Sequence, residues 1–183
     1  MKVIKAKTAG FCFGVKRAVD TVYKQVDTKC GQIYTYGPII HNEEVIKDMR
    51  DKGVIVLRSE EDLDMISQGT VIIRSHGVEK RIYEKIEQKG LRIVDATCPF
   101  VKKIHNIVSE KSGEGFHIII IGNPEHPEVV GIKGWAKDNV TVIQSAEDAE
   151  CFTADRKEKI CIVSQTTFNY NKFQDLVEII MKK

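Results

Sequence analysis

The stretch TAGFCFGVKRA (residues 8–18) places one cysteine between two glycines. It follows the apolar run Val3–Ala6, which predicts a strand, and it precedes residues whose spacing is typical of a helix. Glycines on both sides let the backbone pass close to a bulky group. A thiol in this setting is accessible to a bound group, so Cys12 is a candidate ligand of an inorganic centre. The alternative is a small packed residue without chemistry.

A second cysteine stands at a similar place in the stretch DATCP (residues 95–99). There a predicted strand gives way to a helix, and Pro99 suits the first position of that helix. A thiolate is favoured near the amino end of a helix, so Cys98 is the second candidate ligand, with a buried inert thiol as the alternative. By contrast, Cys161 lies inside an apolar run and is expected in the core. We expect Cys30 and Cys151 to be incidental thiols at or near the surface.

The whole chain alternates between short apolar runs and segments with helical spacing. The runs predict strands at residues 2–6, 33–36, 54–57, 70–73, 91–94, 117–121, 140–143 and 160–163. The segments predict helices over residues 15–26, 43–52, 80–88, 100–111 and 171–181. This order predicts an α/β fold with mainly parallel sheets flanked by helices. We expect two similar small lobes, residues 1–96 and residues 97–183.

Composition narrows the class of protein. The chain has 183 residues, of which 42% are hydrophobic and 30% charged, as in a globular protein with a real core. A net charge of +2 and the lack of a lysine-rich run argue against bulk nucleic-acid binding. No apolar run reaches the length of a membrane span and no signal-peptide layout is present, so we expect a cytoplasmic protein. Five irregularly spaced cysteines do not suggest a disulfide framework.

Polar residues that can bind ligands or transfer protons recur at one kind of position, just after a predicted strand. These residues are Cys12, His41, His76, Cys98, His126 and Thr166. Ligands of open α/β sheets bind at that edge, and the helix amino ends there attract anions. We therefore expect the histidines to hold an anionic substrate. His105, in mid-helix, and His117, at the start of a strand, are expected to be structural.

The sequence His126-Pro127-Glu128 is the sharpest local signal after the cysteines. Pro124 and Pro127 stiffen the loop, so that the imidazole and the carboxyl group are presented in a fixed way. A histidine can donate to an anionic oxygen, and Glu128 can serve as a general acid. The alternative for Glu128 is a solvated loop acid, and for Thr166 an ordinary helix cap.

The spacing of the cysteines excludes some kinds of site. There is no zinc-type pair of cysteines two residues apart and no glycine-rich nucleotide loop. Iron–sulfur clusters are normally held by cysteines. A cluster with one iron left open to a substrate would need three of them, and this chain supplies two convincing ones.

Taken together, these motifs resemble the 4-hydroxy-3-methylbut-2-enyl diphosphate reductase family, which catalyses the last step of the methylerythritol phosphate route to isoprenoids. The matching stretches are GFCFGVKRA (residues 10–18), His41-Asn42, SHGV (75–78), DATCP (95–99), HPEV (126–129) and QTT (165–167). They occur in the order of the family along nearly the whole chain.

The resemblance implies three α/β domains in a trefoil around a central [4Fe-4S] cluster. It assigns Cys12 and Cys98 as two of three cluster ligands, Glu128 as proton donor, and His41, His76, His126 and Thr166 to the diphosphate or hydroxyl of the substrate. It further implies that ferredoxin or flavodoxin supplies two electrons. The allylic oxygen then leaves as water, and isopentenyl and dimethylallyl diphosphate are formed.

One departure from the family qualifies this interpretation. The C-terminal domain of the family carries the third cluster cysteine and a Ser/Asn motif, and neither is found in this chain. The sequence therefore resembles the first two lobes of a three-lobed enzyme, whose third lobe could be a separate chain. A second hypothesis is a non-catalytic module that binds a phosphorylated ligand or docks on a partner. A third is a thiol-dependent α/β enzyme without a cluster.

Overall fold

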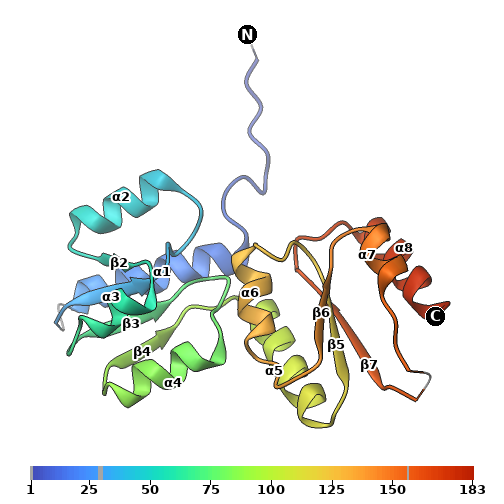
Figure 1. The fold of residues 1–183 in the computed structure, drawn as a ribbon. Coiled ribbons are helices and arrows are strands. Elements are labelled where there is room, and N and C mark those ends of the chain that lie inside the picture. The colour runs from blue at the N-terminus through green and yellow to red at the C-terminus, as the bar shows by residue number, and fades with distance from the viewer. Residues whose placement is uncertain (1, 29–30, 156) are drawn as a thin grey trace. The chain divides into compact units, whose positions relative to one another are not determined.

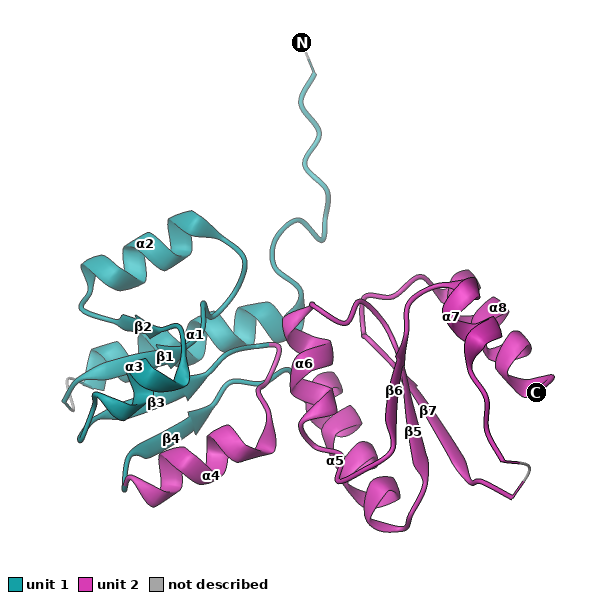
Figure 2. Cartoon of the chain, in the orientation of Figure 1, with its two compact units in different colours: residues 1–75, 90–98 teal, residues 76–89, 99–183 magenta. Residues whose placement is uncertain are grey.

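The computed structural model describes residues 2–28, 31–155 and 157–183. They form two compact units, which are interleaved along the chain (Figure 2). Unit 1 comprises residues 1–75 and 90–98, and unit 2 comprises residues 76–89 and 99–183. The predicted α/β class with parallel sheets is confirmed, whereas the expected lobe boundary after residue 96 stays a prediction.

Unit 1 is built on a parallel sheet in the strand order β2-β1-β3-β4 (Figure 1). The strands are β1 (Ile33–Tyr36), β2 (Ile55–Leu57), β3 (Thr70–Ile73) and β4 (Arg92–Asp95). The helices are α1 (Phe13–Thr28), α2 (Glu43–Asp51) and α3 (Glu60–Asp64). In this order the chain leaves β1 on one side to form β2 and then crosses to the other side to form β3.

Helix α1 anchors the sequence around Cys12 to the core of unit 1. Its apolar stripe of Ala18, Val19 and Val22 is buried in one cluster with Ile33 of β1 and Ile72 of β3. The helix predicted from apolar spacing over residues 15–26 is confirmed, and its apolar residues face the core. Because the helix is fixed along its length, its amino end is held in place as well.

Unit 2 repeats the same arrangement with a smaller parallel sheet in the order β6-β5-β7. Its strands are β5 (His117–Ile121), β6 (Val140–Ile143) and β7 (Ile160–Ser164). Its helices are α4 (Lys80–Gln88), α5 (Pro99–Gly113), α6 (Pro127–Lys133), α7 (Ala146–Cys151) and α8 (Tyr170–Met181). None of the helices in the described part of the chain is long and apolar enough to cross a membrane.

The central strand β5 shows why unit 2 has helices on both faces of its sheet. Ile118 and Ile120 pack in a cluster with Val108 of α5 and Ile132 of α6. Their neighbours Ile119 and Ile121 point to the other face and pack in a cluster with residues of α7 and α8. All four isoleucines are fully buried. A parallel strand covered on both faces reads as a continuous apolar run, which this one does.

Residues 76–89 belong to unit 2 although they connect two strands of unit 1. The indole Nε1 of Trp135 donates to the carbonyl oxygen of Val78 at 2.9 Å, and its ring contacts that of Tyr83. A Cβ on Gly134 would lie 2.4 Å from the side chain of Glu79, so only glycine allows this close approach. These contacts tie the start of α4 to the end of α6.

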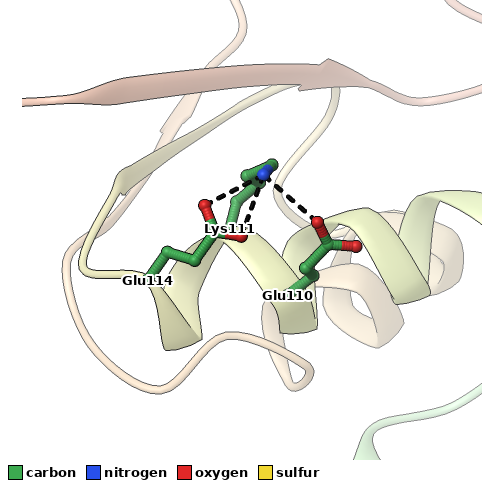
Figure 3. A network of polar contacts seen from close by, with 3 residues as sticks. All are labelled: Glu110, Lys111 and Glu114. Carbon is green, nitrogen blue, oxygen red and sulfur yellow. Dashed lines mark hydrogen bonds and ion pairs between the residues drawn. The ribbon is translucent and has the colours of Figure 1, made fainter.

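The carboxyl end of α5 carries a small polar network (Figure 3). The ammonium of Lys111 contacts Glu114 at 2.9 Å and Glu110 at 3.1 Å, and it lies 5.5 Å from the ring centre of Phe116. Hydrogen bonds to Glu114 and then Glu110 raise the pKa of Lys111 above its ordinary value. A cation in the last turn also complements the helix dipole.

Most sequence-based boundaries agree with the structure to within two residues, but one strand is wrong. Residues 2–6 form no strand (Figure 1). Val3 and Ile4 in this segment are 81% and 78% exposed. The apolar pattern alone is not sufficient, because a strand needs a neighbour to accept its backbone hydrogen bonds. The short helices α3, α6 and α7 were not predicted, since five to seven residues carry too little periodicity.

Candidate functional site

In each sheet the chain first adds a strand on one side and then crosses to the other side. The point where the strand order reverses is the topological switch point, where ligands of open α/β sheets bind. In unit 1 this point lies between β1 and β3, which are hydrogen-bonded neighbours. In unit 2 it lies between β5 and β7. His41 and Ser75 follow the two strands of the first pair, and Glu128 and Thr166 follow those of the second. The predicted site residues His41, Glu128 and Thr166 therefore stand at the carboxyl edge of the sheet of their own unit.

Cys12 immediately precedes α1 and closes its first turn. Its carbonyl oxygen accepts the backbone N–H of Lys16 at 2.9 Å. Its side chain is exposed, as a ligand-binding thiol must be and a packed structural thiol is not. The amino end of a 16-residue helix has a positive character, which favours a negatively charged group at this position.

Cys98 lies against the start of the same helix. A Cβ built on Gly14 would lie 2.6 Å from the Sγ atom of Cys98, so the sulfur occupies the space that a side chain would need there. Cys98 is half-buried and directly precedes α5, at Pro99. Both cysteines thus lie at the first turn of α1, Cys12 directly before the helix and Cys98 against Gly14.

Backbone hydrogen bonds connect the loops at the carboxyl edge of unit 1. The carbonyl oxygen of Ile39 accepts both the N–H of Ser75 at 3.3 Å and its hydroxyl at 3.1 Å. The carbonyl oxygen of Ser75 in turn accepts the N–H of Cys98 at 2.8 Å. The loops after β1, β3 and β4 therefore form one connected edge, which fixes the backbone of Cys98.

His41 ends the loop that follows β1, and it is exposed. The next residue, Asn42, caps α2 by accepting the N–H of Val45 on its side-chain oxygen at 3.0 Å. Gly37 starts this loop with a φ of 73°, a conformation that favours glycine. His41 is thus placed between a fixed turn and a capped helix.

In unit 2, His126 caps α6 and contacts His76, which belongs to the same unit. Its Nδ1 accepts the N–H of Glu128 at 3.1 Å. With Nδ1 acting as an acceptor, the neutral ring carries its proton on Nε2, which is then a donor. The rings of His76 and His126 meet edge to face, with centroids 5.4 Å apart. The structure therefore brings these two predicted residues together.

Glu128 is buried, with 1% of its surface exposed, and both of its carboxyl oxygens are bound by one residue. Thr166 donates its backbone N–H to Oε1 at 2.6 Å and its hydroxyl to Oε2 at 2.9 Å. The solvated-acid alternative for Glu128 is therefore wrong. A buried carboxyl group fixed by two hydrogen bonds has one defined orientation, as a directed proton donor requires.

Two residues that the sequence analysis did not assign to the site, Gln165 and Gly122, support the loops beside this pair. Gln165 accepts the N–H of Asn123 on Oε1 at 3.2 Å and donates from Nε2 to the hydroxyl of Thr167 at 2.9 Å. Gly122 is needed because a Cβ there would lie 2.8 Å from Val129 and 2.9 Å from Gln165. The motif around Thr166 contains Gln165, but its bonds depend on how β5 and β7 pair.

The remaining cysteines show no such convergence. Cys151 is exposed at the end of α7, and Cys30 lies outside the described residues. Cys161 is half-buried, less than expected for the core, and burial raises the pKa of its thiol. It pairs in register with Ile118 near the start of β7, whereas Thr166 follows the other end of that strand. It therefore lies near the opposite end of β7 from Thr166, the residue that binds Glu128.

The histidines expected to be structural are packed as expected. His105 is buried and stacks on Trp135, with ring centroids 5.1 Å apart. The ring nitrogens of His117 contact Glu158 at 3.0 Å and Thr141 at 2.8 Å, which joins β5 to β6 and to the loop before β7. Both residues therefore lie in the framework of unit 2.

An iron–sulfur cluster fits the two thiols at the start of α1 in part. Their place at the first turn of α1, the absence of a side chain at Gly14 and the positive helix end suit two corners of such a group. Within the part of the chain that the structure describes, no three metal-ligating side chains come together. A cluster here would therefore need a further ligand in addition to Cys12 and Cys98.

Comparison with known proteins gives one consistent result. The family described as LytB protein matches residues 3–183. The curated 4-hydroxy-3-methylbut-2-enyl diphosphate reductase of Caldanaerobacter subterraneus subsp. tengcongensis is 45% identical over 184 residues. That of Clostridioides difficile is 42% identical over 189 residues. The two alignments include 100% and 99% of this chain but only 63% and 67% of those proteins.

Solved structures agree with the sequence relatives. The reductase described as the terminal enzyme of the non-mevalonate pathway superposes with a TM-score of 0.82 at 38% identity, over 98% of this chain and 63% of that one. The E-1-hydroxy-2-methyl-but-2-enyl-4-diphosphate reductase of Plasmodium falciparum superposes with a TM-score of 0.89 at 30% identity, over 96% and 55%. The chain thus spans less than two thirds of the length of these proteins.

Proposed function

The chain belongs to the LytB protein family. We propose that it forms part of an iron–sulfur reductase, and that the whole reductase converts 4-hydroxy-3-methylbut-2-enyl diphosphate to isopentenyl and dimethylallyl diphosphate. The observation that carries the proposal is the buried carboxyl of Glu128, bound through both oxygens by Thr166 at the switch point of unit 2. In a member of this family, such a carboxyl is a directed proton donor for the departing hydroxyl group.

Histidines would bind the diphosphate. His126 presents its Nε2–H because its Nδ1 is occupied by the N–H of Glu128, and His76 lies edge to face with it. Imidazole N–H groups donate well to phosphate oxygens, and a protonated ring adds charge. His41, exposed after β1 in unit 1, is proposed for the same role. No lysine-rich surface is needed, in agreement with a net charge of +2.

Glu128 would protonate the leaving oxygen. Removal of a hydroxyl group as water needs a proton at that oxygen, and a fixed acid within hydrogen-bond reach supplies it. The hydroxyl of Thr166 lies 2.9 Å from Oε2, so it can orient that oxygen and itself hydrogen-bond the substrate hydroxyl. Two electrons and two protons are needed for each substrate that loses its oxygen as water.

Cys12 and Cys98 would hold the redox centre. When bound there, an iron–sulfur cluster would supply the two electrons and a Lewis-acidic iron for the allylic oxygen. The positive end of α1 stabilises anionic sulfur at this position. The third ligand would come from a segment corresponding to the part of the relatives that this chain does not span, or from a second polypeptide. A ferredoxin or flavodoxin is the proposed electron donor, and the cytoplasm the proposed location.

The test is reductant-driven conversion of the hydroxy-diphosphate, followed by product analysis. The protein is assayed alone and with the C-terminal region of the Caldanaerobacter relative added as a separate or joined chain. The proposal predicts products in the presence of that region and their loss in Glu128→Gln. Absence of products under both conditions, with the cluster present, would overturn it.

A second candidate function is a binding module for a phosphorylated ligand without catalysis. It is favoured by one observation, that no third metal-ligating side chain joins Cys12 and Cys98 among the described residues. This module would bind the diphosphate through His76 and His126 but would contain neither iron nor sulfide after anaerobic purification. Titration calorimetry with the diphosphate, combined with metal analysis, separates the two functions.

A further inference from the structure

Arg17 connects the two segments of unit 1 that carry cysteines. It lies on α1, one helical turn after Phe13, the residue that follows Cys12. Its guanidinium donates from Nη1 to the carbonyl oxygen of Thr97 at 2.9 Å and from Nη2 to that of Asp95 at 3.3 Å. The helix that begins after Cys12 therefore holds the loop that ends in Cys98.

The geometry of this contact suits arginine and no other side chain. One accepting carbonyl belongs to Asp95, the last residue of β4, and the other to Thr97, two residues later, and both lie within reach of one guanidinium. A guanidinium is planar, always charged and has several N–H donors in a fixed fork, which can reach two acceptors at once. A lysine ammonium has its donors on a single nitrogen, so it lacks the second nitrogen by which Arg17 reaches the other carbonyl.

The loop is held from its other side as well. The side chain of Asp95 accepts the N–H of Thr97 at 2.9 Å, and the carbonyl oxygen of Ser75 accepts the N–H of Cys98 at 2.8 Å. With Arg17 in addition, the backbone before Cys98 is fixed between β3 and α1. As a result, the sulfur of Cys98 stays 2.6 Å from the position of a Cβ on Gly14.

We infer that Arg17 is a positioning residue that keeps the Cys98 thiol at the amino end of α1, beside Cys12. Without it, the loop after β4 would keep its bonds to β3 but would no longer follow α1. The two thiols would then sample a wider range of separations. The binding of a cluster by these two thiols rests on the proposed function. The positioning of Cys98 near Cys12 by Arg17 does not rest on it.

The test measures the pairing of the thiols directly. In a background with Cys30, Cys151 and Cys161 replaced by alanine, dibromobimane becomes fluorescent when it joins Cys12 to Cys98. We expect Arg17→Met to slow this cross-linking about tenfold, the order of effect of losing hydrogen bonds from a charged donor. Arg17→Lys should recover part of the rate. Single alkylation by iodoacetamide should change little, because each thiol stays accessible.

Two control variants separate positioning from general effects. Lys24→Met removes a cation from the exposed side of the same helix, and Met49→Ala weakens the core of unit 1 without touching Arg17. Both should cross-link at the rate of the parent protein. Circular dichroism on heating confirms that each variant is folded, and Arg17→Lys serves for the comparison with the parent if Arg17→Met does not fold.

The outcome is independent of activity. An unchanged cross-linking rate in a folded Arg17 variant would overturn the inference. A slower rate in both Arg17 variants, with unchanged controls, would support it, even if the parent protein binds no iron. In that case the proposed function alone would fail. If the parent binds iron and the Arg17 variants cross-link normally, the proposed function stands and the positioning role is wrong.

Discussion

Thr166 binds both carboxyl oxygens of Glu128, through its backbone N–H at 2.6 Å and its hydroxyl at 2.9 Å. The two residues come from opposite sides of the switch point of unit 2, since Glu128 follows β5 and Thr166 follows β7. A contact of this kind exists only when the two strands pair as they do here. The orientation of the proposed acid, Glu128, therefore depends on the pairing of β5 and β7 as well as on the residues next to it in sequence.

Replacement of Glu128 by glutamine should abolish turnover. The amide keeps an oxygen for the N–H of Thr166, so the fold survives, but it has no acidic proton to transfer. We expect a loss of about 10²-fold or more in kcat, with the Kd for the diphosphate unchanged. Glu125→Gln, on the exposed part of the same loop, is the matched control. Turnover at the parental rate in Glu128→Gln would remove Glu128 from its role.

Replacement of Thr166 by valine should lower kcat with little change in KM. Valine has nearly the same shape and keeps the backbone bond to Oε1, but it loses the hydroxyl bond to Oε2. The loss of one such bond changes the rate by about tenfold. Thr166→Ser restores the hydroxyl and should restore kcat. Steady-state kinetics would contradict this if valine and serine behaved alike.

Replacement of Gly14 by alanine should separate the thiols. The new Cβ would lie 2.6 Å from Sγ of Cys98, closer than real contacts allow, so the sulfur or the helix must move. We expect bound iron to fall several-fold after anaerobic reconstitution. Gly113→Ala is the control, because it lies in a helix with nothing within 4 Å and should be neutral or slightly stabilising. Equal iron content in the two variants would show that Cys98 is not a ligand.

The contact between α1 and α2 should make unit 1 sensitive to acid. Bonds from Lys52 and then Tyr23 lower the pKa of Asp48 below its ordinary value. The stabilisation is therefore present above the pKa of the unfolded state, and it is lost as pH falls through the folded-state pKa. Melting temperatures between neutral pH and pH ~3 should fall more for the parent than for Asp48→Asn. Parallel curves would contradict the contribution of this carboxylate.

Much of the fold could be predicted from local pattern. Two segments carry strong signals, the buried run Ile118–Ile121 and the apolar face of α1 around Ala18. A fully buried strand is apolar at every position, whereas a helix buried on one face is apolar at every third or fourth position. The apolar residues Val3 and Ile4 have the same local pattern as a strand but find no neighbour. Whether a strand forms is decided by its partner, which a single segment of sequence does not encode.

The candidate site was predictable only in its motif residues. Cys12, His126 and Glu128 stand out because glycine and proline fix the backbone around them. Arg17 and Gln165 lie within matching stretches, but the sequence gives them no role, since their bonds join residues 78 and 42 positions apart and depend on the packing of α1 and on the pairing of β5 and β7. Their roles could be recognised only when the distances between atoms were known.

Metal analysis tests the central claim most directly. Iron and acid-labile sulfide would be measured after anaerobic reconstitution of the protein joined to the C-terminal region of the Caldanaerobacter relative. The account predicts about one cluster per chain, its loss in Cys12→Ser and in Cys98→Ser, and its retention in Cys151→Ser, whose thiol lies at the end of α7. The same iron and sulfide content in all three variants, or neither in the parent, would contradict it.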